Sequence, residues 1–416
     1  MDGGLYAELT KKKWLVSHTK ASDAGIQFTD KLIILPQQIP VIVYPYEWSF
    51  AMWQDAALLT LYIAKEAIEK GMSLKDATPF NIQFLDGRPI FIDTLSFEKY
   101  APEKPWIAYR QFCECFLAPL LLQQYCHTDT GKIFTVYPNG IPLELLISLL
   151  PKKAKWNLHT YLHIYLQASA KGGNTKSNVK AATQFSKQKM LLLLNGLSTY
   201  VKKLHVKKNK STWDDYYDTT ILSNQYLQNK TSLVTSFLNT ITFTSIVDLG
   251  ANDGHFSLLF KNTATRIVAV DGDANCINEL YVTLRNEKIK NILPLINTLQ
   301  TPSPAIGWNN AERASFNERI KGDVVFALAL VHHLAIANNI PFQFIADWLA
   351  PMGNYFLIEF VPKTDNKVQL LLQNRQDIFD DYTSQDFEAV FSKKFEILLQ
   401  QVITGTDRIL YLMKKI

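Results

Sequence analysis

A short apolar run in the second half of the chain, Ile246-Val-Asp-Leu249, leads directly into closely spaced glycines. Asp248 lies within this run, and Gly250, Asn252 and Gly254 follow it before an amphipathic segment begins. Glycines allow the backbone to turn sharply and to approach a ligand closely. In an open α/β sheet, ligands bind in the crevice at the carboxyl ends of the strands. The spacing therefore predicts a ligand-binding loop between a strand and a helix.

The spacing of these glycines argues against NAD and FAD as cofactors. The dinucleotide pattern is Gly-x-Gly-x-x-Gly, and it places a pyrophosphate at the N-terminus of the following helix. Here the pattern is Asp-x-Gly-x-x-x-Gly, so the first and second glycines of the dinucleotide pattern cannot both be placed.

A second apolar run ends in two carboxylates. In Val268-Ala-Val-Asp-Gly-Asp273, Asp271 comes 17 positions after Gly254. The carboxyl ends of neighbouring parallel strands meet at one edge of a sheet, so this acid is expected beside the glycine loop. A carboxylate in that position can accept hydrogen bonds from two adjacent hydroxyl groups.

Two further apolar runs end in groups that could move a proton. One leads into His332 and His333, and another ends at Glu359. An imidazole titrates near neutral pH, which suits a general base. Leaving a charge unpaired in an apolar environment is costly, so a glutamate that closes an apolar strand is often functional. These three residues are the candidate bases, and the alternative is that a histidine caps a helix or packs in the core.

Apolar runs alternating with helical stretches indicate the elements that must position these residues. Strands are predicted at residues 245–249, 266–270, 291–296, 323–329 and 355–359, with a closing pair at 395–403 and 408–413. Nearly continuous apolar strands indicate a parallel sheet that is covered on both faces. The predicted fold class is a doubly wound, Rossmann-like α/β sheet, preceded by a mixed α+β region and a helical segment.

The segments Asp-Leu-Gly-Ala-Asn (248–252) and His-His-Leu (332–334), with Asp271 between them, resemble those of class I S-adenosylmethionine-dependent methyltransferases. The whole chain resembles a bacterial family of such enzymes, some of which carry nodulation-associated names. The resemblance implies S-adenosylmethionine as cofactor and an unidentified small-molecule or saccharide-like acceptor. It implies that Asp271, or as second choice Asp273, binds the ribose and that Asn297 faces the adenine. The remaining implied cofactor residues are Asp248, Gly250, Asn252 and Gly254.

Two more segments are predicted to line this site. The long loop at 300–315 contains Trp308, Asn310, Glu312 and Arg313, which we predict to help form the acceptor site, because long structured loops beside a crevice are often functional. An aromatic helix before the sheet would place Tyr216 or Tyr217 over the cofactor as a lid. The alternatives are a scaffold loop and a core helix.

The N-terminal region contains Asp76 and Asn81, then a hairpin turn at Asp86-Gly87, then Asp93. This order resembles the catalytic loop and metal-binding Asp of the protein-kinase and aminoglycoside-phosphotransferase fold, in which such residues orient a hydroxyl and hold Mg²⁺. The sequence departs from that family because it has no Gly-rich loop and no Val-Ala-Ile-Lys strand. We therefore predict a reduced kinase-like region. The alternatives for this region are an active phosphotransferase and a chance arrangement of Asp and Asn, which are common turn residues. For the whole protein, the alternative to a methyltransferase is a non-catalytic protein that binds S-adenosylmethionine.

Length and composition limit the number of domains and the classes of function that the chain can have. The 416 residues predict two to three domains, which we place at 1–125, 126–212 and 213–416. The net charge of +5 does not predict a nucleic-acid binder, and the basic run at 202–210 is interpreted as a solvated helix end, with substrate steering as the alternative. Four cysteines argue against a disulfide scaffold, and no metal site is predicted. The lack of a signal-like or membrane-spanning run predicts a cytoplasmic protein, and the sequence sets no oligomeric state.

Overall fold

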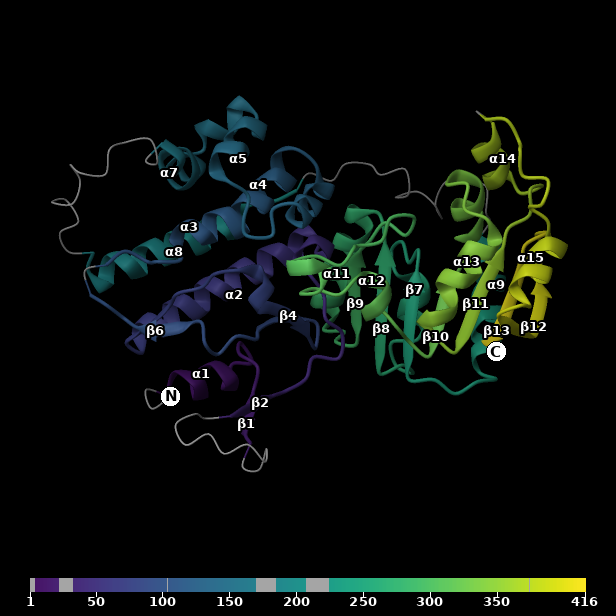
Figure 1. Cartoon of the computed structure of the whole chain (residues 1–416), viewed down its shortest axis with the longest axis horizontal. Coiled ribbons are helices and arrows are strands. Elements are labelled where there is room, and N and C mark those ends of the chain that lie inside the picture. The colour runs from purple at the N-terminus through teal and green to yellow at the C-terminus, as the bar shows by residue number, and fades with distance from the viewer. Residues whose placement is uncertain (1–3, 22–32, 103, 170–184, 207–223, 374) are drawn as a thin grey trace. The chain divides into compact units, whose positions relative to one another are not determined.

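The chain divides into two compact units, Met1–Lys208 and Asn209–Ile416 (Figure 1). The computed structural model describes residues 4–21, 33–102, 104–169, 185–206, 224–373 and 375–416. The helices predicted as a separate connecting region lie within the first unit. The predicted boundary at 212/213 lies outside the described residues.

The first unit is built on one long helix, α2 (Phe50–Glu69), which packs against α8 (Lys187–Lys203). Thirteen of the 20 residues of α2 are buried, so this helix forms the centre of the unit's core. It ends just before Gly71, whose φ of +74° lets the chain turn into the next strand. The other described helical segments of the unit are α1 (Leu5–Lys11), η1 (Pro45–Glu47), η2 (Pro79–Asn81), α3 (Tyr109–Phe112), η3 (Cys113–Leu117), α4 (Ala118–Tyr125), η4 (Thr128–Thr135), α5 (Leu143–Leu149), η5 (Lys152–Trp156), α6 (Leu158–Thr160), η6 (Tyr161–Tyr165) and α7 (Leu166–Ser169).

The described strands of the first unit form three separate antiparallel pairs. These are β1 (His18–Lys20) with β2 (Ile34–Pro36), β3 (Met72–Leu74) with β6 (Phe97–Lys99), and β4 (Ile82–Leu85) with β5 (Arg88–Phe91). The predicted hairpin at Asp86-Gly87 is confirmed, because these two residues join β4 to β5 with φ of +52° and +71°. Positive φ at both central residues is what a tight two-residue hairpin turn requires.

A seven-stranded sheet forms the centre of the second unit, in the order β12-β13-β11-β10-β7-β8-β9. Strands β7 to β11 run parallel, and β13 is antiparallel to both of its neighbours. The five predicted strands and the closing pair are confirmed to within a few residues at their ends. Their bounds are β7 (Ser245–Leu249), β8 (Arg266–Asp271), β9 (Ile292–Ile296), β10 (Val324–Ala327), β11 (Tyr355–Phe360), β12 (Phe395–Val402) and β13 (Ile409–Lys415).

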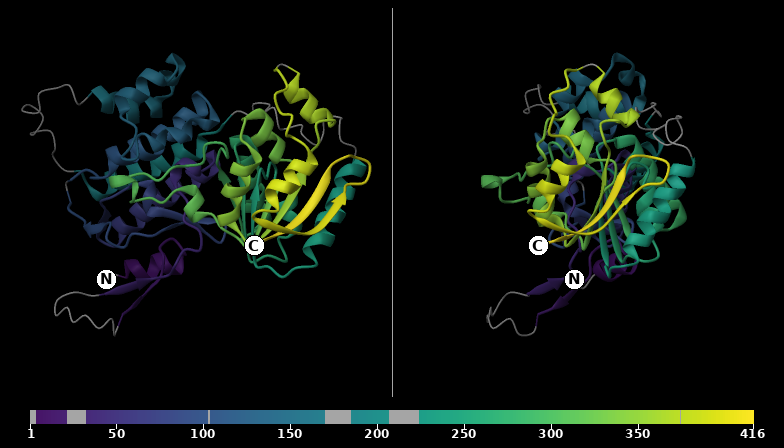
Figure 2. Two further views of the ribbon diagram at one scale, coloured as in Figure 1. Left: turned by 45° about the vertical axis from the view of Figure 1, so that its right-hand side comes forward. Right: turned by 90° about the vertical axis from the view of Figure 1, so that its right-hand side faces the viewer.

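Helices cover both faces of this sheet, as the right-hand view of Figure 2 shows from the β12–β13 end. Alternate residues of the strands, such as Ile246, Phe326 and Leu357, pack with α9, α10 and α11 in one apolar cluster. The opposite face is rich in aromatic side chains that pack with α13 and α15, such as Phe360 against Phe387. The helices of this unit are α9 (Asn224–Leu238), α10 (His255–Leu259), α11 (Ala274–Glu287), α12 (Phe316–Arg319), α13 (Phe342–Leu349), α14 (Asn366–Leu372) and α15 (Ser384–Phe391).

Within the described part of the chain, no helix combines the length and the apolar character needed to cross a membrane.

Candidate functional site

The glycine loop leaves the carboxyl end of β7 in a conformation that depends on its residue types. Gly250, Asn252 and Gly254 all have positive φ, at +79°, +51° and +81°. A Cβ atom at Gly254 would lie 2.7 Å from Leu280 of α11, so both the backbone and the packing exclude a side chain there. At Gly250 a Cβ atom would meet only Leu330, at 3.6 Å, so this glycine is required for its backbone angle and leaves open space beside the loop.

Asp271 lies at the end of β8, and its carboxylate accepts one backbone hydrogen bond from the glycine loop and one from the residue that caps α11. Its Oδ2 accepts from the N–H of Asn252 and its Oδ1 accepts from the N–H of Asp273, each at 2.8 Å. The Gly272 N–H also bonds to this carboxylate, and since a carboxylate offers about four acceptor positions, capacity remains for a ligand. Burial raises the pKa of Asp271, while the same N–H groups favour its charged form.

Two neighbouring predicted residues, Asp273 and Asn297, have structural partners of their own. Asp273 caps α11, because its Oδ1 accepts from the N–H groups of Asn275 and Cys276 at 2.8 and 3.2 Å. Asn297 is buried, and its backbone N–H donates to the Asp271 carbonyl at 2.8 Å.

Asp248 lies on the face of β7 that packs with α9 and α10. Its Oδ2 accepts a hydrogen bond from the Ser257 hydroxyl of α10 at 2.7 Å. Burial raises the pKa of Asp248 to about 6. The residue therefore ties the strand to the helix that follows the loop.

The two predicted histidines follow β10 at the same edge of the sheet. His332 is fully buried, and neither of its ring nitrogens has a hydrogen-bond partner among the described residues. Its ring centroid lies 4.1 Å from that of His333. Burial lowers the pKa of His332 well below its ordinary value, and the nearby charges of Arg408 and Lys230 act in the same direction. Burial, together with Lys367 and Arg408, lowers the pKa of His333 to about 4.

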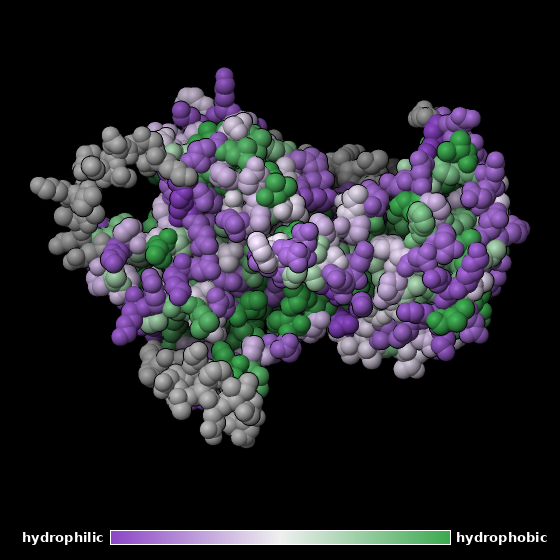
Figure 3. Space-filling model, in the orientation of Figure 1, coloured by the Kyte–Doolittle hydropathy of each residue, from purple (hydrophilic) through white to green (hydrophobic). Residues whose placement is uncertain are grey.

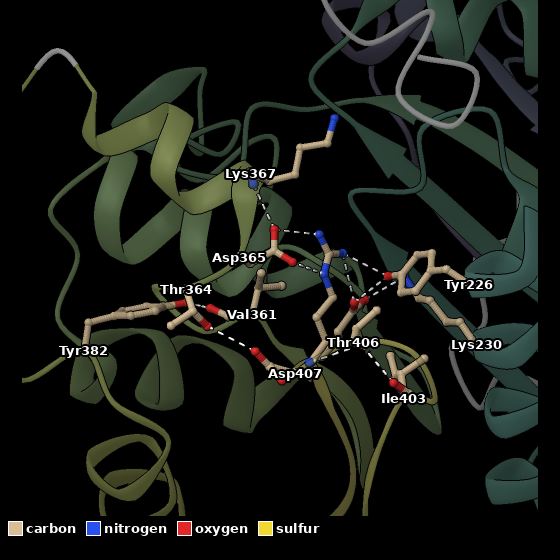
Figure 4. Close-up of polar contacts among 12 residues, drawn as sticks. Tyr226, Lys230, Val361, Thr364, Asp365, Lys367, Tyr382, Ile403, Thr406 and Asp407 are labelled. Carbon is tan, nitrogen blue, oxygen red and sulfur yellow. Dashed lines mark hydrogen bonds and ion pairs between the residues drawn. The ribbon is translucent and has the colours of Figure 1, made fainter. Parts of the chain in front are cut away.

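Glu359 is part of a buried ionic network at the carboxyl end of β11 (Figure 4). It is on the face of the strand that carries Leu357, so its side chain points toward α9. Its Oε2 lies 2.6 Å from Lys230 Nζ, and its Oε1 accepts from the Tyr226 hydroxyl at 2.7 Å. Arg408 Nη1 donates to the same Oε1 at 3.2 Å.

Arg408 extends this network to a second carboxylate. Its Nε and Nη2 donate to the two carboxylate oxygens of Asp365 at 2.7 and 3.0 Å, which is a bidentate arrangement. Asp365 also caps α14, by accepting from the Lys367 N–H at 2.8 Å. The two cations and two carboxylates balance in charge, and together they join α9, β11, α14 and the start of β13.

The network changes what Glu359 can do. Burial alone would raise the pKa of Glu359, but Lys230 and Arg408 hold it below its ordinary value. Both Glu359 oxygens already contact Lys230, Tyr226 or Arg408, so the geometry gives this carboxylate a structural role, and its role as base stays a prediction. Sequence reasoning missed Lys230, Arg408 and Asp365, because a lysine on an amphipathic helix and an arginine beside a strand are usually surface residues.

The remaining segments predicted to line the site are only partly described. Tyr216 and Tyr217 lie outside the described residues. The loop at 300–315 is closed by a pair of backbone hydrogen bonds between Ile306 and Arg313, and Trp308 at its tip is 84% exposed. The Arg313 guanidinium contacts the Glu312 carboxylate at 3.1 Å. Their role in binding an acceptor stays a prediction.

In the first unit, the structure brings the predicted Asp76, Asn81 and Asp93 together around Ser96. Asn81 Nδ2 donates to the Ser96 hydroxyl at 3.0 Å and lies 3.5 Å from Asp76 Oδ2. The Ser96 hydroxyl in turn donates to Asp93 Oδ2 at 2.6 Å. Gln111 donates to the other oxygen of Asp76 at 2.7 Å. Among the described residues, no group of three or more His, Cys, Asp or Glu side chains is arranged to hold a metal ion.

The second unit thus combines a mostly parallel seven-stranded sheet with a glycine loop and an acidic residue at its carboxyl edge. This combination is that of a Rossmann-like α/β fold. No protein-family model matches the chain. The chain is 33% identical over 381 residues to the nodulation protein NoeA of Rhizobium meliloti (strain 1021), and the alignment covers 90% of this chain and 80% of that protein. The chain therefore belongs to the NoeA family.

Solved structures resemble about half of the chain. The N-methyltransferase NodS of Bradyrhizobium japonicum WM9, in complex with S-adenosyl-l-homocysteine, is 10% identical with a TM-score of 0.36, and the match covers 49% of this chain and 92% of NodS. The magnesium protoporphyrin IX methyltransferase ChlM of Synechocystis PCC 6803, with bound SAM, is 13% identical with a TM-score of 0.32. That match covers 46% of this chain and 79% of ChlM.

Proposed function

We propose that the second unit binds S-adenosylmethionine and transfers its methyl group to a small-molecule or saccharide-like acceptor. The observation that carries this proposal is the junction of the glycine loop with Asp271. The loop turns at three residues of positive φ, and the Asn252 N–H bonds to the Asp271 carboxylate at 2.8 Å. A glycine loop beside an acid on the next strand suits a nucleoside whose ribose hydroxyls need an acceptor.

The residues present fit this cofactor. Asp271 would accept hydrogen bonds from the ribose hydroxyls, because its carboxylate has acceptor capacity left. The open space beside Gly250 would let the cofactor approach the backbone closely. Asn297, which is hydrogen-bonded to the Asp271 backbone, would lie beside the adenine, and Asp273 and Asp248 would fix the helices on either side of the loop. S-adenosylmethionine supplies a methyl group that is already activated, so binding and orientation are the protein's main tasks.

His332 is the favoured candidate for a base that removes a proton from the acceptor. It follows the strand next to β7, and its imidazole stays neutral near pH 7 because burial lowers its pKa. Both ring nitrogens lack a partner among the described residues, so one can accept a proton or a hydrogen bond from an acceptor hydroxyl or amine. In this proposal Glu359 is a positioning residue, because the network holds α9 and α14 on either side of the strand ends.

A binding measurement tests the cofactor assignment. We expect Asp271→Ala to weaken the binding of radiolabelled S-adenosylmethionine by about 10- to 100-fold in equilibrium dialysis, because hydrogen bonds to a charged group contribute about 1.5–3 kcal/mol. Asp253→Asn is the matched control, since Asp253 is an exposed acid of the same loop and asparagine can keep its hydrogen bond to the His255 N–H. Equal affinity of the folded Asp271→Ala variant and the wild type would overturn the ribose assignment.

A second measurement distinguishes an enzyme from a non-catalytic cofactor-binding protein. Methyl transfer releases S-adenosylhomocysteine, so its formation is measured with a panel of saccharides and other small acceptors. We expect release with one acceptor class and its loss in His332→Gln at unchanged cofactor affinity. Tight cofactor binding with no release on any acceptor would favour the non-catalytic alternative.

Phosphotransfer by the first unit is a second candidate function, supported by the cluster of Asp76, Asn81 and Asp93 around Ser96. Two carboxylates and an amide are the groups that hold Mg²⁺ and orient a hydroxyl in phosphotransferases. Each carboxylate also has hydrogen bonds within the cluster, which agrees equally with a structural role. ATP turnover that survives Gly250→Arg but is lost in Asp93→Ala would establish this function, and no ATP binding would remove it.

A further inference from the structure

We propose that the helix at residues 158–169, with the lysines that precede it, is a surface that docks on an anionic lipid membrane. The helix is made of α6, the π-helical turn η6 and α7, which follow one another without a gap. Its inner face is buried at Thr160, His163 and Ile164. This inference is independent of the function proposed for the second unit.

The outer face of this helix is also apolar. Leu158, Leu162 and Leu166 recur at every fourth position and are 66%, 42% and 43% exposed. Trp156, directly before the helix, is 89% exposed. A surface helix normally presents polar residues to water, so a helix that is apolar on both sides calls for an external apolar partner. Figure 3 shows that green apolar side chains occur among hydrophilic ones (purple) on the drawn face of the first unit.

A cluster of cations adjoins this apolar face. Lys152, Lys153 and Lys155 on η5 are all exposed. Lys152 and Lys153 have no acidic partner within the described ranges of the chain, and Lys155 Nζ lies 5.9 Å from the centre of the Tyr165 ring. These lysines stand just before a helix N-terminus, where the helix dipole disfavours cations. The lysines therefore do not stabilise the helix at this position, and an anionic binding partner would account for them.

The sequence around this surface has the same charge character. Residues 145–213 contain 13 lysines and no aspartate, glutamate or arginine. The whole chain has a net charge of +5, so the remaining residues together carry 5 − 13 = −8. The basic charge is thus concentrated in a 69-residue stretch, and the small net charge of the whole chain conceals it.

The combination favours a lipid surface over other anionic partners. Membrane-surface helices pair leucines and a tryptophan with flanking lysines, because tryptophan prefers the headgroup level and lysines are attracted to anionic lipids. Nucleic acid would use the lysines but leave the leucines exposed. A symmetric contact with a second copy would bury the leucines but bring like charges together.

Vesicle flotation of the full chain tests the proposal. We expect binding to vesicles of phosphatidylcholine and phosphatidylglycerol, much weaker binding to phosphatidylcholine alone, and loss of binding at high salt. Replacing Lys152, Lys153 and Lys155 by glutamine should reduce the affinity by about a hundredfold. Trp156→Ala should reduce it by about tenfold, since one large apolar side chain leaves the interface.

Matched variants control for charge and for exposed aromatic area. The triple replacement of Lys290, Lys321 and Lys393 by glutamine removes the same charge from exposed positions of the second unit, and Phe344→Ala removes a side chain that is 64% exposed. Both should bind vesicles like the wild type, and unfolding temperatures confirm that all variants are folded. Brominated lipids should quench the tryptophan fluorescence of the wild type more than that of Trp156→Phe.

Three outcomes would overturn the proposal. The first is no binding to either kind of vesicle. The second is vesicle binding that the control variants lower as much as the surface variants do. The third is a dimer in analytical ultracentrifugation that Trp156→Ala dissociates, which would assign the surface to a second copy of the chain.

Discussion

The buried ion pair between Lys230 and Glu359 makes a sharp stability prediction. Both side chains are at most 2% exposed, and their charged atoms lie 2.6 Å apart. Lys230→Met leaves Glu359 with Arg408 and the Tyr226 hydroxyl, and Glu359→Gln leaves Lys230 without its nearest carboxylate. We expect each single variant to lower the free energy of unfolding by about 3–5 kcal/mol, which is typical when one partner of a buried pair is removed.

The geometry sets the scale of this effect. Coulomb's law with an effective dielectric constant of about 20 gives about 6 kcal/mol for unit charges at this separation. The cost of burying both charges offsets much of that attraction in the wild type, so the pair itself adds little net stability. The double variant Lys230→Met/Glu359→Gln leaves neither charge unpaired. It should therefore be more stable than the sum of the single changes predicts, by about 1–3 kcal/mol.

Urea unfolding followed by circular dichroism measures all four proteins of this cycle. Lys290→Met, at an exposed position, is the control and should change the unfolding free energy by less than about 0.5 kcal/mol. Additive single effects of less than about 1 kcal/mol each would refute the buried pair. Unchanged stability of Glu359→Gln together with complete loss of methyl transfer would instead restore Glu359 as the base.

Three further predictions concern the loop and the strand ends. Gly254→Ala should lower the free energy of unfolding by about 2–4 kcal/mol and abolish cofactor binding, because φ is +81° and the new Cβ would meet Leu280 at 2.7 Å. An unfolding temperature equal to that of the wild type would contradict this prediction. Burial raises the pKa of Asp248 to about 6, so protonation of this carboxyl group stabilises the folded state. This contribution to the free energy of unfolding is complete below about pH 4 and is lost as the pH rises through 6. Between pH 4 and 7 the unfolding temperature of the wild type should therefore fall relative to that of Asp248→Asn, and a constant difference would be the opposing result. His332→Leu should unfold at the same or a higher temperature than the wild type, because an unpartnered buried imidazole costs about 1–3 kcal/mol, whereas a marked loss of stability would indicate a partner that holds the ring.

Much of the second unit could be predicted because its signals are local. Each core strand is a short apolar run, and the strands begin and end close to where those runs do, as with Ser245–Leu249. The glycines of the loop are required by backbone angles that few other residues adopt, so Gly250 and Gly254 stand out in the sequence itself. The position of Asp271 could be predicted from the same strand pattern, because this residue lies where the apolar run of β8 stops.

The ionic network could not be predicted in the same way. Glu359 stands out in the sequence because it closes an apolar strand, but its partners come from α9 and from the residue before β13. Lys230 lies in α9, six residues after the first residue of that helix. Arg408 comes 178 positions later in the chain and directly precedes β13. Only the three-dimensional structure shows that α9 crosses the end of β11, and this contact turns a candidate base into a paired carboxylate.

The first unit was harder to interpret from sequence for a related reason. Its hairpin at Asp86-Gly87 was predicted from a two-residue signal, and the structure confirms it. The meeting of Asp76, Asn81 and Asp93 depends on Ser96, which contacts Asn81 and Asp93 and carries no signal of its own. The apolar outer face of the helix at 158–169 was also missed, because its period is the same as that of an ordinary buried face.

Calorimetric titration of the full chain with S-adenosylmethionine, with ATP·Mg²⁺ in a parallel cell, tests the proposed function most directly. The proposal predicts one cofactor site of about micromolar affinity, of the order of 8 kcal/mol, that Asp271→Ala weakens strongly and Asp253→Asn leaves intact. Binding of ATP·Mg²⁺ with no binding of S-adenosylmethionine would contradict it and would move the active site to Asp76, Asn81 and Asp93.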